Sequence, residues 1–240
     1  MLPREDRLAQ VFVELADTLV ADFDVVEFLT TLAHRTAELL HAADAGVVLA
    51  DERGVLRSVA SSTEAAQLLD LFEIQSDEGP CLDCYRSGVA VVNASLERPD
   101  RWPTFSPEAR RLGYLGVHAI PMRLRGEVIG AVNIFTTSDV TLVPAEVELA
   151  QGLADVATIS LLQERGIREA RLLNEQLQAA LHSRVVIEQA KGMLAERRGI
   201  ELAEAFELLR GHARSANRKL GEVAAGILDG TVTAEALDRR

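Results

Sequence analysis

The sequence predicts an α+β domain with a central antiparallel sheet, joined by a long helix to a small all-helical domain. Three observations support this prediction. Apolar residues recur at helical spacing near the start of the chain, alternate at strand spacing through its middle, and return to helical spacing from about Pro144 onward. Helices before and after a run of strands are typical of α+β folds whose terminal helices pack on one face of the sheet. The length of 240 residues, 48% of them hydrophobic, gives room for one large domain or two modest ones.

Two helices are expected before the sheet. Apolar residues follow helical spacing over residues 8–19 and again over 25–40, and Asp24 is positioned to cap the second helix. The period then changes to that of strands. Residues 45–50 and 55–60 are apolar and rich in β-branched side chains, and the polar turn between them predicts a β-hairpin.

The middle of the chain alternates short elements with loops. Residues 76–81 and the Pro-rich residues 97–104 mark breaks in the pattern, with one turn of helix expected up to Tyr85. The remaining expected elements are helices over residues 64–73 and 107–112 and strands over residues 89–93, 116–124 and 127–135.

Charge is distributed unevenly along the chain. The net charge of −12 argues against attraction of the whole surface to nucleic acid or to anionic membranes. From Arg168 onward, however, the chain carries 12 basic and 11 acidic residues, whereas the preceding 167 residues carry 13 basic and 26 acidic residues. The two parts of the chain are therefore expected to face different partners.

Three stretches of the first part carry a family resemblance. They are the hairpin at residues 45–60, the Glu-Gly-Pro-Cys loop at 78–81, and the closing strand pair at 119–134, which contains a small-Pro-hydrophobic segment, a Gly turn and a hydrophobic-Gly-hydrophobic run. Over roughly residues 8–162 the sequence resembles a GAF domain, the small-molecule sensor fold. The resemblance implies a sensor domain over residues 1–162 with a ligand pocket between the sheet and the loops that cover it.

Seven residues are candidates for such a sensor pocket, and core packing is the competing interpretation for each of them. The candidates are Cys81, Cys84, Tyr85, Trp102, Phe105, His118 and Asn133. A small-molecule ligand is expected as a partner, but the sequence identifies neither that ligand nor a cofactor.

The two cysteines form the one chemically reactive-looking motif, Cys81-Leu82-Asp83-Cys84. A Cys-x-x-Cys pair is typical of redox centres and of half a zinc site. A zinc site needs further ligands, and the five histidines show no matching spacing, so no metal is expected. Redox sensing and simple packing of two small residues in a loop both stay open.

A heptad pattern runs along the long helix. Ten positions follow alternating steps of four and three, and seven of them are apolar: Leu149, Leu153, Val156, Ser160, Gln163, Ile167, Ala170, Asn174, Leu177 and Leu181. The first half is expected to pack on the sheet. The second half has little of its own domain to pack against, so residues 163–181 are predicted to form a connector that pairs as a parallel coiled coil, with Asn174 setting the register.

The last quarter of the chain reads as three short amphipathic helices with basic outer faces. In the first, starting at Ser183, Arg184, Lys191 and Arg198 share one face, and Gly199 is expected just after its last turn. The second is expected to bury Leu202, Ala205, Phe206, Leu209 and Ala213, with Arg210, Arg214 and Arg218 outside. The third is expected to be capped by Asn217. Together these helices predict a three-helix bundle.

Four ordered motifs in this bundle carry a second and closer resemblance. Residues 180–184 read ALHSR, residues 187–192 read IEQAKG, residues 204–214 read EAFELLRGHAR and residues 220–224 read LGEVA. Residues 182–240 are similar to the ANTAR domain, the RNA-binding output module of bacterial transcription antiterminators. One departure is Glu201, which stands where a Ser or Thr helix cap is common.

The resemblance implies a mechanism. ANTAR domains dimerise and bind paired stem-loops in nascent mRNA leaders, which prevents a competing terminator hairpin from forming. The partners implied are RNA and a second copy of the chain, and cationic side chains suit phosphates and loop bases. The residues implied in RNA binding are Arg184, Lys191, Gly192, Arg198, Arg210 and Arg214.

Two other classes of function stay open beside a signal-regulated antiterminator. The bundle would also serve a regulator that acts through dimerisation or protein–protein interaction, or a DNA-binding regulator of helix-turn-helix type. An enzyme is not expected, because the sequence shows no nucleophile elbow, phosphate-binding Gly loop or metal-ligand spacing. The charged start predicts no secretory leader, and no apolar run reaches the length of a bilayer span, so a cytoplasmic protein with no membrane partner is expected.

Overall fold

The computed structural model describes residues 10–15, 24–97, 101–138, 141–233 and 237. The chain divides into two compact units, Met1–Arg165 and Gly166–Arg240. Of the helix expected over residues 8–19, residues 10–15 are helical and the others lie outside the described residues.

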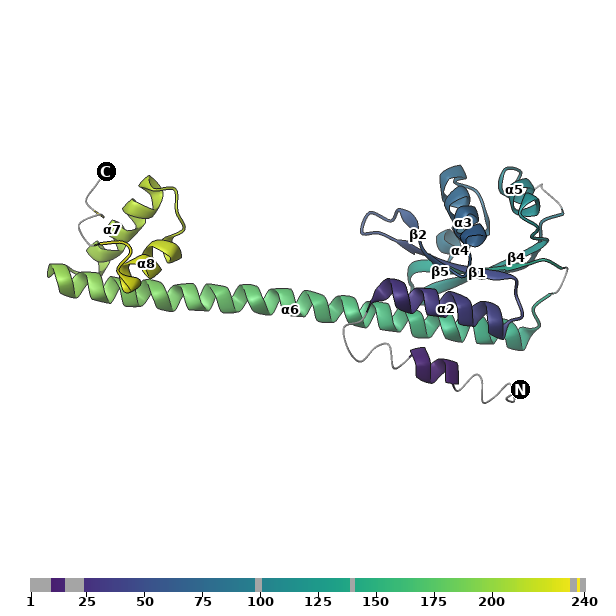
Figure 1. Cartoon of the computed structure of the whole chain (residues 1–240), viewed down its shortest axis with the longest axis horizontal. Coiled ribbons are helices and arrows are strands. Elements are labelled where there is room, and N and C mark those ends of the chain that lie inside the picture. The colour runs from purple at the N-terminus through teal and green to yellow at the C-terminus, as the bar shows by residue number, and fades with distance from the viewer. Residues whose placement is uncertain (1–9, 16–23, 98–100, 139–140, 234–236, 238–240) are drawn as a thin grey trace. The chain divides into compact units, whose positions relative to one another are not determined.

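A five-stranded antiparallel sheet is the centre of the first unit (Figure 1). Its strand order is β2-β1-β5-β4-β3, so the first and last hairpins meet through β1 and β5. The expected hairpin is confirmed, with Ala50 paired to Leu56 next to the turn. The strands are β1 (Asp44–Ala50), β2 (Leu56–Ser61), β3 (Val91–Ser95), β4 (Gly116–Leu124) and β5 (Glu127–Thr136).

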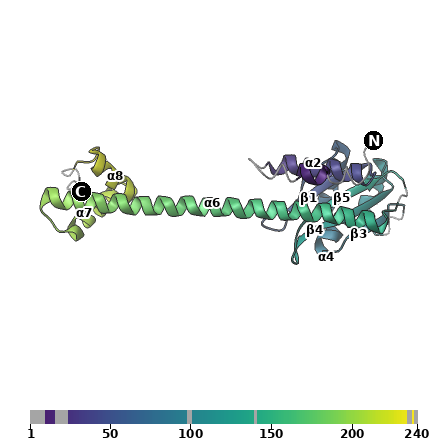
Figure 2. The same cartoon turned by 90° about the horizontal axis from the view of Figure 1, so that it is seen from below.

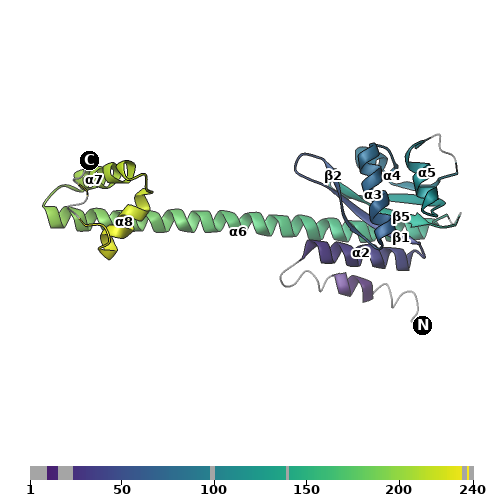
Figure 3. The same cartoon turned by 45° about the horizontal axis from the view of Figure 1, so that its top comes forward.

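Helices cover both faces of this sheet. On one face lie α2 (Val25–Leu39) and the first part of α6 (Pro144–Arg198), side by side in Figures 1 and 2. On the other face lie α3 (Glu64–Ser76), α4 (Pro80–Ser87) and α5 (Phe105–Arg111), as Figure 3 shows. The α+β architecture predicted from the sequence, with the flanking helices α2 and α6 on a shared face, is confirmed.

Strand alternation assigns each central side chain to one of two cores. Ile120 of β4 and Ile134 of β5 belong to the core under α2 and α6. Their neighbours Ala119 and Phe135 belong to the core under α3, α4 and α5. In the middle of β4 and β5, even-numbered residues therefore point to the core under α2 and α6, and odd-numbered residues point to the core under α3, α4 and α5. Candidate sensor residues on these strands can meet only when they point to the same core.

The helix starts follow local rules. Asp24 caps α2 as expected, because its Oδ1 accepts hydrogen bonds from the backbone N–H groups of Val26 and Glu27 at 2.8 and 3.2 Å. The observed limits of two short elements differ slightly from the expected ones. Helix α5 begins at Phe105, two residues before the expected start, and β3 lies two residues later than expected.

The second unit contains the last part of α6, α7 (Leu202–Ser215) and α8 (Leu220–Asp229). Helix α6 is continuous from Pro144 to Arg198, so the connector and the first bundle helix are one element. It ends as expected at Gly199, whose φ of +64° and the bond from the Ile200 N–H to the Ala195 carbonyl (3.1 Å) close the last turn. The bundle core consists mainly of Ala190, Leu194, Ala205, Leu209, Ala213, Val223, Ala224 and Ile227.

Three expectations for this bundle were wrong. Leu202 is 53% exposed because it is the first residue of α7, and Phe206 is only partly buried. Asn217 does not cap α8; Lys219 holds the N-cap position and makes no side-chain cap. Asn217 instead follows the last turn of α7 with φ +51°, where its N–H donates to the Arg214 carbonyl, so it acts as a helix-stop residue and not as a helix-start residue.

Candidate nucleic-acid interface and sensor core

A pocket of about 590 Å³ lies beside α7 in the second unit, and we name it the basic pocket. Four of its lining residues carry a cationic side chain, and none carries a carboxylate. The basic pocket is lined by Phe206, Arg210, Ala213, Arg214, Asn217, Arg218, Lys219 and Leu220.

The sequence assembles these cations by two local devices. Arg210 and Arg214 are four residues apart on α7 and therefore share a face of the helix. The left-handed residue Asn217 then turns the chain, and the Arg218 N–H bonds back to the Ala213 carbonyl at 2.9 Å. This Schellman-type turn places Arg218 and Lys219 at the same pocket as the α7 arginines.

The acidic neighbours of the basic pocket hold its arginines only loosely. Arg210 Nη1 lies 3.5 Å from Glu207 Oε1, and Arg218 Nε lies 3.9 Å from a carboxylate oxygen of Glu222. Both arginine side chains are nearly half exposed. Exposed ion pairs of this kind contribute little, about 0–1 kcal/mol, so the guanidinium groups are available for phosphate.

Phe206 gives the basic pocket an aromatic face. The Lys191 ammonium nitrogen lies 5.5 Å from the centroid of the Phe206 ring. It also donates to both carboxylate oxygens of Glu188 at 3.0 and 2.9 Å. An aromatic ring set among cations is the arrangement on which unpaired bases stack while their phosphates are neutralised.

The residues implied in RNA binding are thus only partly gathered. Arg210 and Arg214 line the basic pocket, and Lys191 reaches it through Phe206. Arg184, Gly192 and Arg198, all on α6, are not among its lining residues. Arg184 and Gly192 are exposed, and an added Cβ at Gly192 would meet nothing within 4 Å.

Sequence reasoning missed three members of the basic pocket. It assigned Phe206 to the core and left Arg218 and Lys219 outside the set of implied contacts. A signal for Phe206 was present, because residues 206, 210 and 214 are spaced by four and so share one helix face with the arginines.

The sensor unit contains a buried polar cluster on the sheet face under α3 and α4. Asn133 of β5 donates through Nδ2 to Asp70 Oδ1 at 2.9 Å and to Glu73 Oε2 at 3.0 Å. Glu73 Oε1 accepts the Cys81 backbone N–H at 2.6 Å. Asp70, Glu73 and Asn133 are all fully buried. A Cβ at position 46 would lie within 2.0 Å of Asp70 Oδ2, so Gly46 makes room for this carboxyl group.

Burial governs the ionisation of this cluster. It raises the pKa of Asp70 to about 7, against which the hydrogen bonds from Asn133 and Ser61 act. It raises the pKa of Glu73 well above its ordinary value, and the neighbouring charge of Asp70 raises it further. The pair therefore retains protons to unusually high pH.

The two cysteines border this cluster and are buried free thiols. Burial raises the pKa of Cys81 well above its ordinary value and that of Cys84 to about 12, and the carboxyl group of Glu73 adds to both shifts. Both thiols are therefore protonated at neutral pH, which disfavours nucleophilic or redox reactivity.

The other candidate sensor residues are divided between the two faces of the sheet. Trp102 and Phe105 are buried and pack edge to face, and Trp102 Nε1 donates to Asp83 Oδ2 at 3.1 Å. His118 is on the α2 and α6 side, opposite to Asn133 across the sheet. Its Nδ1 accepts the Asn93 N–H at 2.9 Å, and burial lowers its pKa to about 4.

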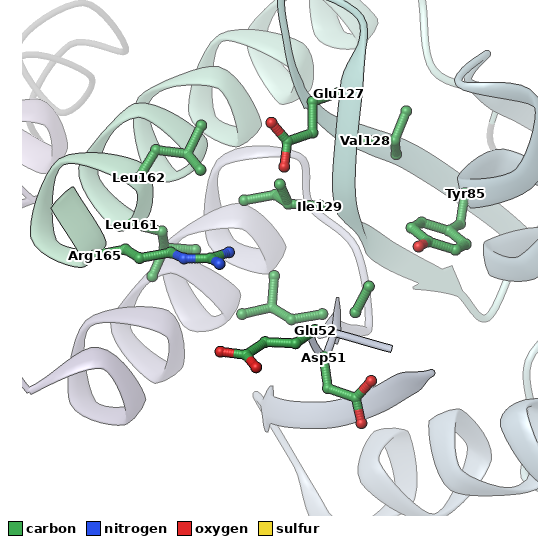
Figure 4. A pocket seen from close by; sticks show the side chains of 11 residues that line it. Asp51, Glu52, Tyr85, Glu127, Val128, Ile129, Leu161, Leu162 and Arg165 are labelled. Atoms are coloured by element: carbon green, nitrogen blue, oxygen red, sulfur yellow. The ribbon is translucent and has the colours of Figure 1, made fainter. Parts of the chain in front are cut away.

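Of these seven residues, Tyr85 lines the pocket that we name the rim pocket (Figure 4). It measures about 560 Å³ and lies in the first unit where the ends of β1 and β5 approach α6. Its lining residues are Leu49, Ala50, Asp51, Glu52, Tyr85, Glu127, Val128, Ile129, Leu161, Leu162 and Arg165. Among the described residues, no group of three or more His, Cys, Asp or Glu side chains is placed to hold a metal ion.

Two family models match the sequence. Residues 24–161 match a GAF domain model and residues 175–228 match an ANTAR domain model. No catalytic family is found, and the two domains point to a regulatory protein. A search of curated proteins finds no match to this chain. Within the described part of the chain, no helix is both long enough and apolar enough to cross a membrane.

Solved structures with the same fold cover the sensor unit. The GAF domain of a phosphoenolpyruvate-protein phosphotransferase from Coxiella burnetii matches with a TM-score of 0.53 and 17% identity, covering 68% of this chain and 97% of that one. The corresponding domain from Acinetobacter gives a TM-score of 0.52 and 13% identity over 70% and 99%. Free methionine-R-sulfoxide reductase from Neisseria meningitidis gives 0.51 and 18% over 68% and 91%.

At such identities these likenesses show the fold alone. The ANTAR match implies RNA-binding transcription antitermination, and the GAF match suggests regulation by a signal. The chain belongs to the GAF domain family through residues 24–161 and carries an ANTAR domain at residues 175–228, the pairing typical of GAF-ANTAR antitermination regulators.

Proposed function

We propose that this protein is a signal-regulated antiterminator that binds two adjacent stem-loops in a nascent mRNA leader as a homodimer. Holding these stem-loops prevents the competing terminator hairpin from forming, and the polymerase continues transcription. The observation that carries the proposal is the basic pocket, which Phe206 lines together with Arg210, Arg214, Arg218 and Lys219.

The chemistry of the basic pocket favours a hairpin loop over duplex DNA. A base can stack on Phe206 only when it is unpaired, and loop bases are unpaired while duplex bases are not. The four cations neutralise the phosphates on either side of such a base. Arginine also stacks on bases and pairs with their edges, which lysine does not do as well.

The exposed part of α6 supports the homodimer. Every residue from 166 to 182 is exposed, and the apolar Ile167, Leu177 and Leu181 are 54%, 55% and 64% exposed. These three residues and Asn174 lie on one stripe at heptad spacing. A parallel pair of α6 helices buries this stripe, and Asn174 fixes the register. Two RNA-binding bundles in one particle then match two stem-loops.

We assign one role to each of three successive segments of the chain. Residues 1–162 receive the signal, residues 163–181 form the connector, and residues 182–240 bind RNA. A ligand in the sensor would act by changing how the two connector helices pair. Because nascent mRNA is the substrate, we expect the protein to work in the cytoplasm.

Binding of the purified full chain to labelled nucleic acids tests the proposal. The probes are a tandem-hairpin RNA, a single hairpin of the same RNA, and duplex DNA of the same length, at one salt concentration. We expect the tandem hairpin to bind about tenfold more tightly than the single hairpin, because two linked sites raise the effective concentration. Equal affinity for duplex DNA would favour the DNA-binding alternative. Binding to none of the probes would favour the protein-interaction alternative.

A further inference from the structure

The rim pocket has the shape and lining of a small-molecule site. One wall comes from α6, through Leu161 and Leu162, and another comes from the start of β5, through Ile129. Leu49 at the end of β1 adds a fourth aliphatic side chain. All four side chains are only partly buried, so they leave apolar surface that a ligand would cover.

Polar groups frame this apolar surface. Figure 4 shows Glu127 at one end of the view and Asp51 and Glu52 at the other, with Ile129 between them. In the same view the Tyr85 hydroxyl points toward the apolar side chains. The lining thus holds three carboxylates against the one guanidinium group of Arg165.

The carboxylates differ in how they are already bonded. Asp51 accepts from the backbone N–H groups of Arg53 and Val55 and forms an ion pair with Arg57 at 3.0 Å, which fixes the hairpin turn. Within the described part of the chain, the side chains of Glu52 and Glu127 have no hydrogen-bond or ion-pair partner. These two carboxylates are therefore available to a ligand.

We propose that the rim pocket binds a small organic cation, one or two protonated amines on an apolar body of a few carbons. The ammonium groups pair with Glu52 and Glu127, the aliphatic body covers Ile129 and Leu161, and the Tyr85 ring offers a face for cation–π contact. An anionic ligand is disfavoured because three carboxylates would repel it. A neutral apolar ligand is disfavoured because it would remove charges from water without pairing them.

The position of the rim pocket gives such a ligand a route to the connector. Leu161, Leu162 and Arg165 belong to α6, and the exposed stripe of the same helix begins at Ile167, two residues after Arg165. A ligand that fixes this part of α6 changes the rotation or order of the helix where its pairing stripe starts. This step rests on the proposed antiterminator function, whereas ligand binding itself does not.

Calorimetric titration of the full chain with hexamethylenediamine tests the proposal, with hexamethylene glycol and adipate as probes of equal carbon number. We expect the diamine to bind and the diol and dicarboxylate to bind at least about tenfold more weakly. The variant Glu52→Gln with Glu127→Gln removes both pairing carboxylates. The matched control, Glu97→Gln with Glu148→Gln, makes the same change in net charge at exposed positions outside the lining.

We expect the first double variant to lose diamine affinity by about tenfold or more and the control to keep it. Equal loss in both variants would show a general effect of the acidic surface and would overturn the proposal, as would stronger binding of adipate. Binding of tandem-hairpin RNA, measured without diamine, reports separately on the antiterminator function. RNA binding without diamine binding overturns the rim-pocket site alone, whereas diamine binding without RNA binding supports the site and overturns the function.

Discussion

The ammonium group of Lys191 is held between two partners, the carboxylate of Glu188 at 2.9–3.0 Å and the ring of Phe206 at 5.5 Å. Only 18% of the Lys191 side chain is exposed. Lys191 of α6 therefore contacts Phe206, and Phe206 lines the basic pocket together with Arg210 and Arg214. The IEQAKG and EAFELLR motifs, which lie on different helices, meet at this contact.

Phe206→Leu tests whether the ring is a stacking platform. Stacking of a base on an aromatic side chain contributes about 1–3 kcal/mol, so we expect RNA affinity to fall by about 5- to 150-fold. Leucine keeps an apolar side chain at this partly buried position, so the bundle should remain folded. The control is Leu202→Ala, which changes an exposed residue of the same helix outside the basic pocket. A fluorescence anisotropy titration that gives equal affinities for Phe206→Leu and wild type would remove Phe206 from the site.

Arg210→Ala and Arg214→Ala test phosphate contacts through their salt dependence. Each lost contact to a single-stranded phosphate should reduce the slope of log affinity against log salt by about 0.7. We expect each variant to bind more weakly and with a shallower slope than wild type. Arg197→Ala, an exposed arginine outside the basic pocket, is the matched control and should leave the slope unchanged. Unchanged slopes in the first two variants would place the RNA elsewhere on the bundle.

Leu177→Glu tests the homodimer. The substitution puts a charge on the exposed stripe of α6, where two copies of the chain would bring like charges together and lose apolar burial. Sedimentation equilibrium should give a dimer for wild type and at least about tenfold weaker association for the variant. Leu172→Glu serves as the control because Leu172 is 53% exposed but lies off the stripe. A monomeric wild-type chain, or equal effects of the two substitutions, would contradict the coiled coil.

Asp70 makes the stability of the sensor unit depend on pH. Its pKa of about 7 in the folded protein exceeds its ordinary value of 3.8, so the folded state holds the proton more tightly. The contribution of Asp70 is fully present below about pH 4 and is lost as pH rises to about 7. His118 acts in the opposite sense, because its lowered pKa makes the folded state lose stability as pH falls below about 6.5 toward 4.

Comparison of wild type with Asp70→Asn isolates the carboxyl group. Asparagine carries no charge to bury. The free energy of unfolding of the variant minus that of wild type should therefore increase by about 2–4 kcal/mol from pH 4 to pH 8. Urea unfolding at each pH measures this difference. Glu64→Gln, at an exposed position of the same helix, should show a change with pH below about 1 kcal/mol. A stability difference between Asp70→Asn and wild type that stays constant from pH 4 to pH 8 would mean that Asp70 is ionised over this whole range.

Much of the fold follows from periodicity and end signals that are local in the sequence. Asp24 before an apolar helix, the polar turn between two β-branched strands, and Gly199 after the last basic turn each specify one structural outcome. The prediction that Asn217 caps α8 was wrong because asparagine serves both as an N-cap and as a left-handed residue that ends a helix. The hydrogen bonds of the following two residues, which the sequence does not reveal, decide between these roles.

The sites were harder to predict because they depend on contacts between distant elements. Asp70 and Glu73 occupy the same buried stripe of α3 as Ala66 and Leu69, a spacing that was visible as two acids in an apolar pattern. Their partner Asn133 is about sixty residues away, and the register of β5 brings it there. The rim pocket likewise joins β1, α4, β5 and α6, so only the assembled fold reveals it.

Ultraviolet crosslinking in the protein's own cells, followed by sequencing of the RNA bound to the full chain, tests most directly whether the basic pocket recognises paired stem-loops in mRNA leaders. The Arg210→Ala and Arg214→Ala double variant, expressed to the same level, is the control. We predict that wild-type reads concentrate in mRNA leaders able to form two adjacent stem-loops, the second overlapping a terminator stem, and that the double variant loses this enrichment. Reads spread without preference, or the same enrichment in the variant, would contradict RNA recognition by the basic pocket.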